Sequence, residues 1–216
     1  RYGTVTGVQT CALPIYLDVV QFDISGAYLN SSIEEKFQIF LVPPKGSGIV
    51  LQKGQGLLLR KALYGTKQGA RCWNNELTKR LKGLGYTQAE CEPCLFFKDG
   101  IFLLIYVDDG ILVGNDKGKI NAEIDNISKL WKLRKCGQVN YFLGMRIHKG
   151  KQSIKIDVSG KILGAIGKFR MQDANTVDTP AVAGQILSKA GTELEEQVPY
   201  QSLVGTLLYI SRTCRS

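Results

Sequence analysis

Three aspartates have the residue type and the setting that metal-dependent chemistry requires. Asp23 ends the apolar segment LDVVQFD (17–23), and Asp108 and Asp109 follow the apolar segment IFLLIYV (101–107). If the fold brings the three together, their like charges repel and favour protonation unless a cation is bound. Carboxylate oxygens suit Mg²⁺, and two such ions roughly 3.5–4 Å apart clamp the attacking and leaving oxygens of a phosphoryl displacement. The indicated chemistry is phosphoryl or nucleotidyl transfer.

Each of these aspartates also has an ordinary structural interpretation. Asp-Asp-Gly between two strands is usually a plain turn, because Asp and Gly favour turn conformations. Asp23 by itself is most often a strand-end or capping residue. Only a joint placement at one edge of a sheet favours a catalytic site, so the elements that carry the aspartates decide between the two interpretations.

The hydrophobic pattern predicts an α+β fold that brings the three aspartates together. Apolar runs predict strands, and apolar spacings of three and four residues predict amphipathic helices. In chain order these are a strand at 17–23, a helix at 67–84, strands at 101–107 and 111–114, a helix at 117–134 and a strand at 139–147. This is the split βαβ, ferredoxin-like order, in which the third strand lies between the first two and antiparallel to both. The end of the first strand then meets the turn between the second and third.

Other segments flank this central unit. The pattern predicts strands at 36–42, 57–63, 94–98 and 152–158 and helices at 160–171 and 199–211, with a loop-like segment at 172–197. Asp99-Gly100 between two apolar runs is a strong hairpin signal.

The composition is that of a globular protein with an anionic partner. Of the 216 residues, 44% are apolar and 22% charged, which argues against a disordered chain. No apolar run approaches the ~20 residues that a membrane span needs, and no secretory signal opens the chain. The formal net charge of +9 favours nucleic acid as the partner, although a solvated basic face would give the same charge.

The cysteine pattern gives little support for a metal site. Cys91 and Cys94 form a C-x-x-C pair, but a structural zinc needs two more soft ligands and His148 is the single histidine of the chain. Free thiols in a reducing compartment are the better interpretation.

Residues 1–15 differ in pattern from the rest of the chain. They carry no charge after Arg1, and VTGVQTCALPI resembles the translation of a sequencing-library adapter. We interpret them as an adapter-derived artefact or a disordered arm, and exclude them from the fold prediction.

Six blocks of the sequence resemble copia-type LTR-retrotransposon reverse transcriptases in order and spacing. They are QFDISGAYLN (21–30), LYGTKQGARCW (63–73), YVDDGILVG (106–114), YFLGMRI (141–147), VDTP (177–180) and VGTLLYI (204–210). The resemblance extends over residues 17–216. It implies the ferredoxin-like palm of a right-hand polymerase, with part of the fingers and the start of a thumb or connection.

The resemblance implies roles for the residues that match the catalytic blocks. Asp23, Asp108 and Asp109 look like the metal-binding triad, which would hold two Mg²⁺ ions or, in their place, Mn²⁺. Tyr28 looks like the aromatic gate that excludes a ribose 2′-hydroxyl, although core packing would also explain an aromatic residue there.

Further residues match the nucleotide and primer sites of the family. The segment that would cradle the incoming triphosphate consists of Ile24, Ser25, Gly26 and Ala27. Gly65 and Lys67 match the block that lines the nucleotide and template, although Lys67 also fits as a solvated residue. The turn that would grip the primer consists of Phe142, Leu143 and Gly144, which fit an ordinary strand core nearly as well.

Some positions depart from the family pattern or receive a structural assignment. Trp73 and Trp131 are assigned to the core and not to base stacking. Thr66, Gly69 and Ala70 stand where the family has an apolar residue, Ala and Pro, which puts the start of the helix at 67–84 in doubt. In KLRKCG (132–137), Arg134 or Lys135 would have to replace a general acid, and neither is favoured.

The resemblance also implies a domain plan. Residues 1–15 are set apart, residues 16–148 would be the palm with a remnant of the fingers, and residues 149–216 a truncated thumb- or connection-like segment. The missing fingers, ribonuclease H and integrase would belong to the rest of a Pol polyprotein. We therefore expect the chain to be inactive by itself.

The implied function is RNA-directed DNA polymerase activity on a primed RNA or DNA template with deoxynucleoside triphosphates. The implied location is intracellular, in the cytoplasm or in virus-like particles, without a membrane. One alternative is a two-metal nuclease, but Glu34 and Glu35 lie on a polar turn with no strand pattern that points them inward. The other is a catalytically dead, basic remnant of a decayed element that only binds nucleic acid.

Overall fold

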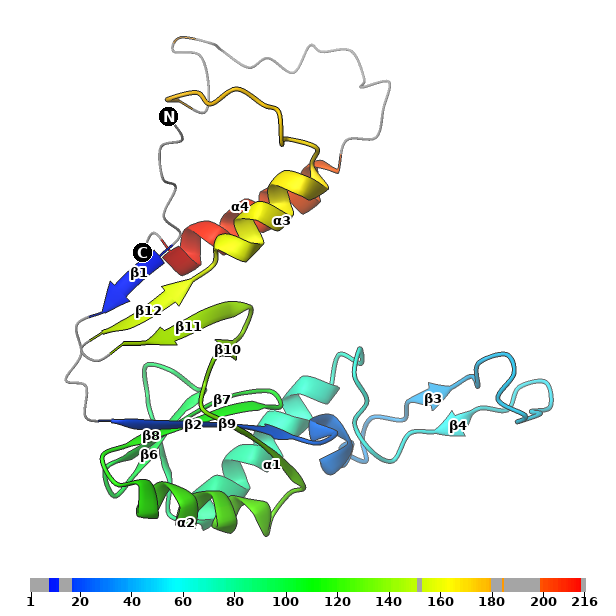
Figure 1. The fold of residues 1–216 in the computed structure, drawn as a ribbon. Helices are drawn as coiled ribbons and strands as arrows, with labels where there is room; N and C mark the ends of the chain where they lie inside the picture. The colour runs from blue at the N-terminus through cyan, green and yellow to red at the C-terminus, as the bar shows by residue number, and fades with distance from the viewer. Residues whose placement is uncertain (1–7, 12–16, 151–152, 180–183, 185–198, 215–216) are drawn as a thin grey trace, which may run out of the picture. The chain divides into compact units, whose positions relative to one another are not determined.

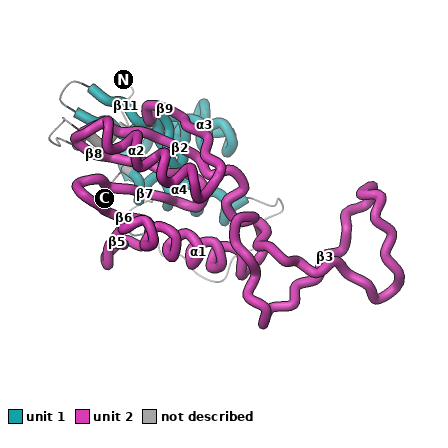
Figure 2. Tube along the Cα trace, turned by 90° about the horizontal axis from the view of Figure 1, so that it is seen from below, with its two compact units in different colours: residues 1–15, 140–216 teal, residues 16–139 magenta. Residues whose placement is uncertain are grey.

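The computed structural model of the chain describes residues 8–11, 17–150, 153–179, 184 and 199–214. The chain divides into two compact units (Figure 2). Residues 16–139 form the aspartate unit, and residues 1–15 together with 140–216 form the C-terminal unit. Each unit contains its own sheet, so the fold is mixed α/β, as the sequence predicted.

A six-stranded sheet is the framework of the aspartate unit. Its order is β5 (Thr87–Gln88), β6 (Leu95–Lys98), β7 (Ile101–Tyr106), β8 (Asp109–Gly114), β2 (Asp18–Ile24) and β9 (Leu133–Gly137). Strand β8 lies between β7 and β2 and runs antiparallel to both, so β2 and β7 are parallel. The split βαβ order predicted from the sequence is therefore confirmed for these three strands.

Two helices, α1 (Gly69–Gly83) and α2 (Lys117–Ser128), cover one face of this sheet (Figure 1). Their buried side chains recur every three or four residues, as an amphipathic helix requires, and pack in one core with the strands; they are Trp73, Leu77 and Leu81 on α1 and Ile120, Ile124 and Ile127 on α2. Phe22 and Ile24 of β2 point into the same core and are fully buried. This core fixes which face of β2 turns toward the helices.

The fourth strand of the predicted order was placed wrongly. The helix predicted to reach residue 134 ends at Ser128, because the N–H groups of Leu130 and Trp131 both donate to the Ile127 carbonyl and close the last turn. The chain then forms β9, which pairs with β2 at the position expected for residues 139–147. Four of the five residues of β9 are exposed, so this edge strand has no apolar pattern that sequence analysis could detect.

The strands predicted at 36–42 and 57–63 shrink to β3 (Phe40–Leu41) and β4 (Leu57–Leu58). Beyond this short ladder the two segments continue to contact through single hydrogen bonds, such as Leu59 N–H to the Ile39 carbonyl at 2.9 Å. Irregular pairing of this kind explains why an apolar run alone overestimated the length of both strands.

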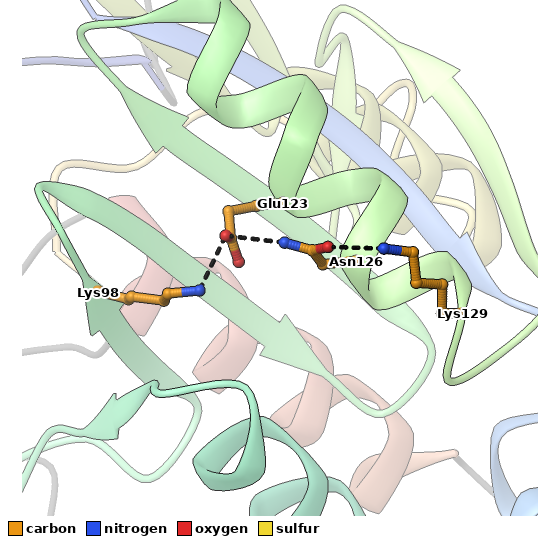
Figure 3. Close-up of polar contacts among 4 residues, drawn as sticks. All are labelled: Lys98, Glu123, Asn126 and Lys129. Atoms are coloured by element: carbon orange, nitrogen blue, oxygen red, sulfur yellow. Dashed lines mark hydrogen bonds and ion pairs between the residues drawn. The ribbon is translucent and has the colours of Figure 1, made fainter.

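A polar network around the buried Glu123 joins strand β6 to helix α2 (Figure 3). Glu123 accepts hydrogen bonds from Lys98 Nζ at 2.9 Å and Asn126 Nδ2 at 3.2 Å, and Lys129 Nζ donates to Asn126 at 3.1 Å. Burial acts to raise the pKa of Glu123, but the hydrogen bonds, led by that from the Lys98 ammonium group, outweigh it and hold the pKa below its ordinary value. The contribution of this ion pair to stability is therefore present at neutral pH and lost as the pH falls through that lowered pKa.

The C-terminal unit contains an antiparallel sheet and two helices. The strand order is β1 (Val8–Cys11), β12 (Ile154–Asp157), β11 (Met145–Lys149) and β10 (Tyr141–Phe142), and the helices are α3 (Ser159–Lys168) and α4 (Tyr200–Cys214). The strand expected at 152–158 and the two helices expected after it are confirmed. Most of the loop predicted at 172–197 lies outside the described residues.

Strand β1 falls within residues 1–15, which the sequence analysis set apart. Its four residues pair with β12, so this part of the segment has strand conformation. The origin of the segment as an adapter sequence stays an interpretation of its letters. In the described part of the chain, every helix is too short or too polar to cross a bilayer.

Candidate active site

The register of the sheet places Tyr106 and three charged residues in one row across four strands. The Cα partners run from Tyr106 on β7 to Asp109 on β8, from Asp109 to Asp23 on β2, and from Asp23 to Arg134 on β9. Phe22 and Ile24 point toward the helices, so Asp23 points to the opposite face, which it shares with its cross-strand partner Asp109. The predicted meeting of distant aspartates is thus observed.

Asp23 and Asp109 form the closer of the two kinds of antiparallel pair. The neighbouring residue Ile24 donates its N–H to the Asp108 carbonyl at 2.7 Å, which makes that pair hydrogen-bonded. Because the two kinds alternate along a ladder, Asp23 and Asp109 form a non-hydrogen-bonded pair, with Cα atoms about 4.5 Å apart. Their carboxyl groups therefore lie within reach of a common ion.

Gly110 follows the aspartates for a steric reason and not for a turn conformation. It lies within β8 opposite Phe22, and a Cβ atom at this position would approach the Phe22 ring to 2.3 Å. The residue of the turn with a positive φ is Val107, at 58°. The glycine of the Asp-Asp-Gly motif thus makes room for the buried ring beneath Asp23 and Asp109.

The two carboxyl groups of the central pair have different electrostatic environments. Arg134 Nη2 lies 3.6 Å from Asp23 Oδ2. Burial, followed by the charges of Asp108 and Asp23, raises the pKa of Asp109, and Arg134 only partly opposes this. Ionised Asp109 therefore costs folding free energy, which the metal-free protein regains as the pH falls through the raised pKa of this carboxyl.

The donor set fits a hard divalent cation. All three groups are carboxylates, and the charges of Asp108 and Asp23 add to burial in raising the pKa of Asp109. Among the described residues, no three His, Cys, Asp or Glu side chains are already arranged around one point as a metal site. Binding of a cation would therefore require the three carboxyl groups to turn toward one another.

Tyr28 stands beside the aspartates in a pair with Tyr64, a residue that the sequence analysis missed. The two rings stack with centroids 4.2 Å apart and an angle of 18° between their planes. The Tyr64 hydroxyl donates to Asp108 Oδ2 at 3.5 Å, and burial together with the Asp108 charge raises the pKa of Tyr64. Tyr64 lies within the block LYGTKQGARCW, but only the structure shows that it reaches an aspartate.

The segment from Ile24 to Ala27 leads directly away from Asp23. The Ile24 N–H is used by Asp108 and the Ser25 N–H donates to the Lys132 carbonyl at 2.9 Å. Gly26 has a φ of 62°, and Ala27 is buried at the start of the short 3₁₀ helix η1 (Ala27–Asn30). A phosphate cradle in this segment would have to use N–H groups after Ser25.

Gly65 and Lys67 are both exposed before helix α1. Gly65 has a φ of 84°, which suits glycine, and α1 begins at Gly69 despite the departures from the family pattern. A Cβ atom at residue 69 would lie 2.7 Å from both the Leu63 carbonyl oxygen and the Thr66 hydroxyl. The backbone here approaches too closely for alanine, which explains the glycine.

The residues proposed to grip a primer lie in the C-terminal unit. Phe142 is buried, and Leu143 and Gly144 form a turn with φ values of 48° and 83°. The Tyr209 hydroxyl donates to the Leu143 carbonyl at 2.7 Å. The turn is well defined within its own unit, and its role stays a prediction.

The structure shows which of the remaining candidate residues lie near the aspartates and which do not. Arg134 lies next to Asp23, whereas Lys135 Nζ contacts Asp125 Oδ1 on α2 at 3.1 Å. Glu34 pairs with Lys36 on its turn, so it is engaged away from the aspartate row. Trp73 and Trp131 are buried and pack edge to face with centroids 5.4 Å apart, as the assignment to the core predicted.

Comparison with known proteins identifies similar sequences. The family model described as reverse transcriptase (RNA-dependent DNA polymerase) matches residues 5–183. The chain is 33% identical over 223 aligned positions to the retrovirus-related Pol polyprotein from transposon TNT 1-94 of Nicotiana tabacum, covering 97% of this chain and 17% of the relative. It is 29% identical over 198 positions to the corresponding polyprotein from transposon RE1 of Arabidopsis thaliana, covering 89% of this chain and 13% of the relative.

A yeast relative is matched over more of its own length. The putative transposon Ty5-1 protein YCL074W of Saccharomyces cerevisiae is 29% identical over 202 positions, covering 89% of this chain and 64% of the relative. The chain thus spans 13 to 17% of the two plant polyproteins and less than two thirds of the yeast protein.

The packing at Gly110 gives a direct test of the register between β2 and β8. Gly110→Ala should lower the free energy of unfolding by about 1–3 kcal/mol, because the added methyl group overlaps the Phe22 ring. Gly114→Ala on the same strand is the control, since a Cβ atom there meets side chains only at 3.5 Å or more, and should cost less than about 1 kcal/mol. Urea unfolding followed by tryptophan fluorescence measures both, and equal losses would contradict the steric account.

The electrostatics of the row predict an effect of Arg134. Arg134→Gln should raise the pKa of Asp109 further, because the Arg134 charge that opposes its protonation is removed. Lys135→Gln is the control and should leave this pKa unchanged, since Lys135 contacts Asp125. Carbon-13 NMR titration of the Asp109 carboxyl group measures the effect, and an unchanged or lowered pKa in Arg134→Gln would contradict the account.

Proposed function

The chain belongs to the reverse transcriptase (RNA-dependent DNA polymerase) family of copia-type retrotransposon Pol polyproteins, and from this premise we propose that its three aspartates catalyse nucleotidyl transfer to a primer. The observation that carries the proposal is the register that sets Asp23 opposite Asp109, with Asp108 in the adjoining turn. Residues 16–148 would be the palm of a right-hand polymerase with a remnant of the fingers, and residues 149–216 would belong to a thumb or connection.

In the proposed reaction the primer 3′ oxygen bonds to the α-phosphorus of a deoxynucleoside triphosphate, and the bond to the β-phosphate breaks to release pyrophosphate. Asp23, Asp108 and Asp109 would hold two Mg²⁺ ions, or Mn²⁺ in their place. When bound, the ions stabilise the attacking and leaving oxygens of this displacement. Before they bind, Arg134 supplies a positive charge next to Asp23.

The aromatic pair would set the choice of sugar. The Tyr28 ring would lie under the deoxyribose and leave no room for a 2′-hydroxyl. Tyr64 stacks on that ring and also contacts Asp108, so it holds Tyr28 at a fixed place relative to the metal-binding groups. Gly65, Lys67 and the segment from Ile24 to Ala27 would line the remainder of the nucleotide site.

The proposed partners follow from the family and the charge. A primed RNA or DNA template suits a chain with a formal net charge of +9, because nucleic-acid affinity depends on phosphate neutralisation. The other segments of a Pol polyprotein, namely the fingers, ribonuclease H and integrase, are further proposed partners. The proposed setting is the cytoplasm or a virus-like particle.

A second candidate function uses the same charge without catalysis. A remnant that only binds nucleic acid would show an affinity that falls steeply with salt, with a slope of about −0.9 per phosphate contact on duplex DNA. It would do so without metal-dependent turnover. The register that sets Asp23 opposite Asp109 favours the catalytic proposal, because a protein that only binds phosphates does not need paired carboxyl groups.

The metal site predicts a specific pattern of Mn²⁺ binding. Titration of the chain followed by electron paramagnetic resonance should show saturable binding, weakened by about 10–100-fold or more in Asp23→Asn and Asp109→Asn. Asp125→Asn is the control, because Asp125 lies on α2 and contacts Lys135. Binding should weaken as the pH falls through the raised pKa of Asp109, since protons compete with the ion. Equal affinity in Asp109→Asn and Asp125→Asn would contradict the proposal.

The reaction is tested in the context of a longer polyprotein. Residues 17–216 can replace the aligned segment of the TNT 1-94 polyprotein, and primer extension on an RNA template is then measured. We expect Mg²⁺-dependent extension that Asp108→Asn abolishes. A chimaera that binds Mn²⁺ and template but extends no better than its Asp108→Asn variant would instead support the binding remnant.

A further inference from the structure

Trp73 connects helix α1 to the turn that carries two of the aspartates. Its side chain is 2% exposed, and its indole N–H donates to the Val107 carbonyl at 2.7 Å. Val107 and Asp108 form the turn between β7 and β8, and Asp109 is the first residue of β8. The bond therefore runs from the core, beneath the sheet, to the peptide unit adjacent to Asp108.

The turn needs a restraint because its backbone is strained. Val107 has a φ of 58°, in the left-handed region that β-branched residues rarely adopt. Such a conformation persists where surrounding contacts hold it, and glycine would adopt it without that cost. The hydrogen bond from the Trp73 indole to the Val107 carbonyl is one such contact.

A second hydrogen bond fixes the next peptide unit of the same turn. The Ile24 N–H on β2 donates to the Asp108 carbonyl at 2.7 Å. Two consecutive carbonyl groups are thus held by the protein, one by Trp73 and one by Ile24. Both bonds end on backbone carbonyl oxygens of the turn, so neither of them uses the Asp108 or Asp109 side chain.

Packing in the core does not by itself explain an indole at residue 73. Trp131 is 4% exposed in the same core and meets the Trp73 ring edge to face, yet among the described residues its indole makes no hydrogen bond to the turn. A phenylalanine ring could fill much of the space at residue 73, but only an indole offers an N–H donor at this point.

We propose that Trp73 is a positioning residue, whose indole N–H holds the strained Val107 turn so that Asp108 and Asp109 stay opposite Asp23. The clamp itself rests on geometry, whereas its use in metal binding rests on the proposed function. It acts through the turn and touches neither substrate nor metal.

The test compares two matched variants of the metal-free chain. Trp73→Phe removes the donor and keeps a ring, and Trp131→Phe removes the other indole of the same core. Hydrogen exchange measured by NMR compares two backbone amides. The Ile24 amide donates to the Asp108 carbonyl in the turn, and the Ile105 amide, the reference, donates to the Cys94 carbonyl at 2.9 Å. In Trp73→Phe the Ile24 amide should exchange roughly three- to tenfold faster relative to Ile105. Unchanged relative exchange, or the same change in Trp131→Phe, would overturn the clamp.

A second variant keeps the test decisive if Trp73→Phe also loosens the core. Val107→Gly relieves the strain, so adding Trp73→Phe to it should have a smaller effect on Ile24 exchange than in the wild-type background. An effect of the same size in both backgrounds would mean that lost packing, and not the turn, causes the change, and would overturn the clamp.

The role of Trp73 in metal binding is tested by a separate measurement. If the proposed function holds, Mg²⁺ should shift the indole N–H resonance of Trp73 and leave that of Trp131 in place, and Trp73→Phe should weaken Mn²⁺ binding. If wild-type chain binds no metal while Trp73→Phe still speeds Ile24 exchange, the proposed function fails and the clamp stands. Mg²⁺ binding that shifts both indoles equally would overturn the specific link to the turn.

Discussion

The antiparallel register of β2 against β8 is the constraint on which the candidate site depends. A slip of one residue would turn Asp23 to the helix-covered face and bring Phe22 out to solvent, because side chains alternate along a strand. The complete burial of Phe22 and Ile24 opposes that slip, since each such side chain contributes about 1.5–3 kcal/mol when buried. Gly110 belongs to the same constraint, because its missing side chain makes room for the Phe22 ring. The apolar face of β2 thus determines on which face of the sheet Asp23 lies.

The unfavourable charge interactions of the unit are concentrated at the aspartates, whereas other parts of the unit contain stabilising ion pairs. Asp109 has a raised pKa because burial and two neighbouring carboxyl groups disfavour its charge, and Arg134 relieves only part of this. On the helix-covered side, the Lys98–Glu123 ion pair is stabilising at neutral pH. A carboxyl group whose pKa is raised beside two other carboxyl groups is typical of a binding or catalytic site.

The sequence was sufficient wherever a strong apolar pattern or hairpin signal specified the element. It predicted β2, α1, the β7–β8 hairpin and the meeting of Asp23 with Asp109. It failed at β9, because an exposed edge strand has no apolar pattern and Leu130 with Trp131 continued the helical spacing past its end. It also missed Tyr64 and the hydrogen bond from Trp73 to Val107, because these contacts join segments far apart in the chain. Contacts of this kind depend on the three-dimensional path of the backbone and leave no local signal.

The most direct test of the account is the register itself. In a non-hydrogen-bonded antiparallel pair the two Hα atoms face each other at short range, so a NOESY spectrum of the labelled chain should contain an Hα–Hα cross-peak between Asp23 and Asp109. This cross-peak is the predicted result. A cross-peak that pairs the Asp23 Hα with Asp108 or Gly110 instead would show a slipped register and would contradict the shared site of the three aspartates.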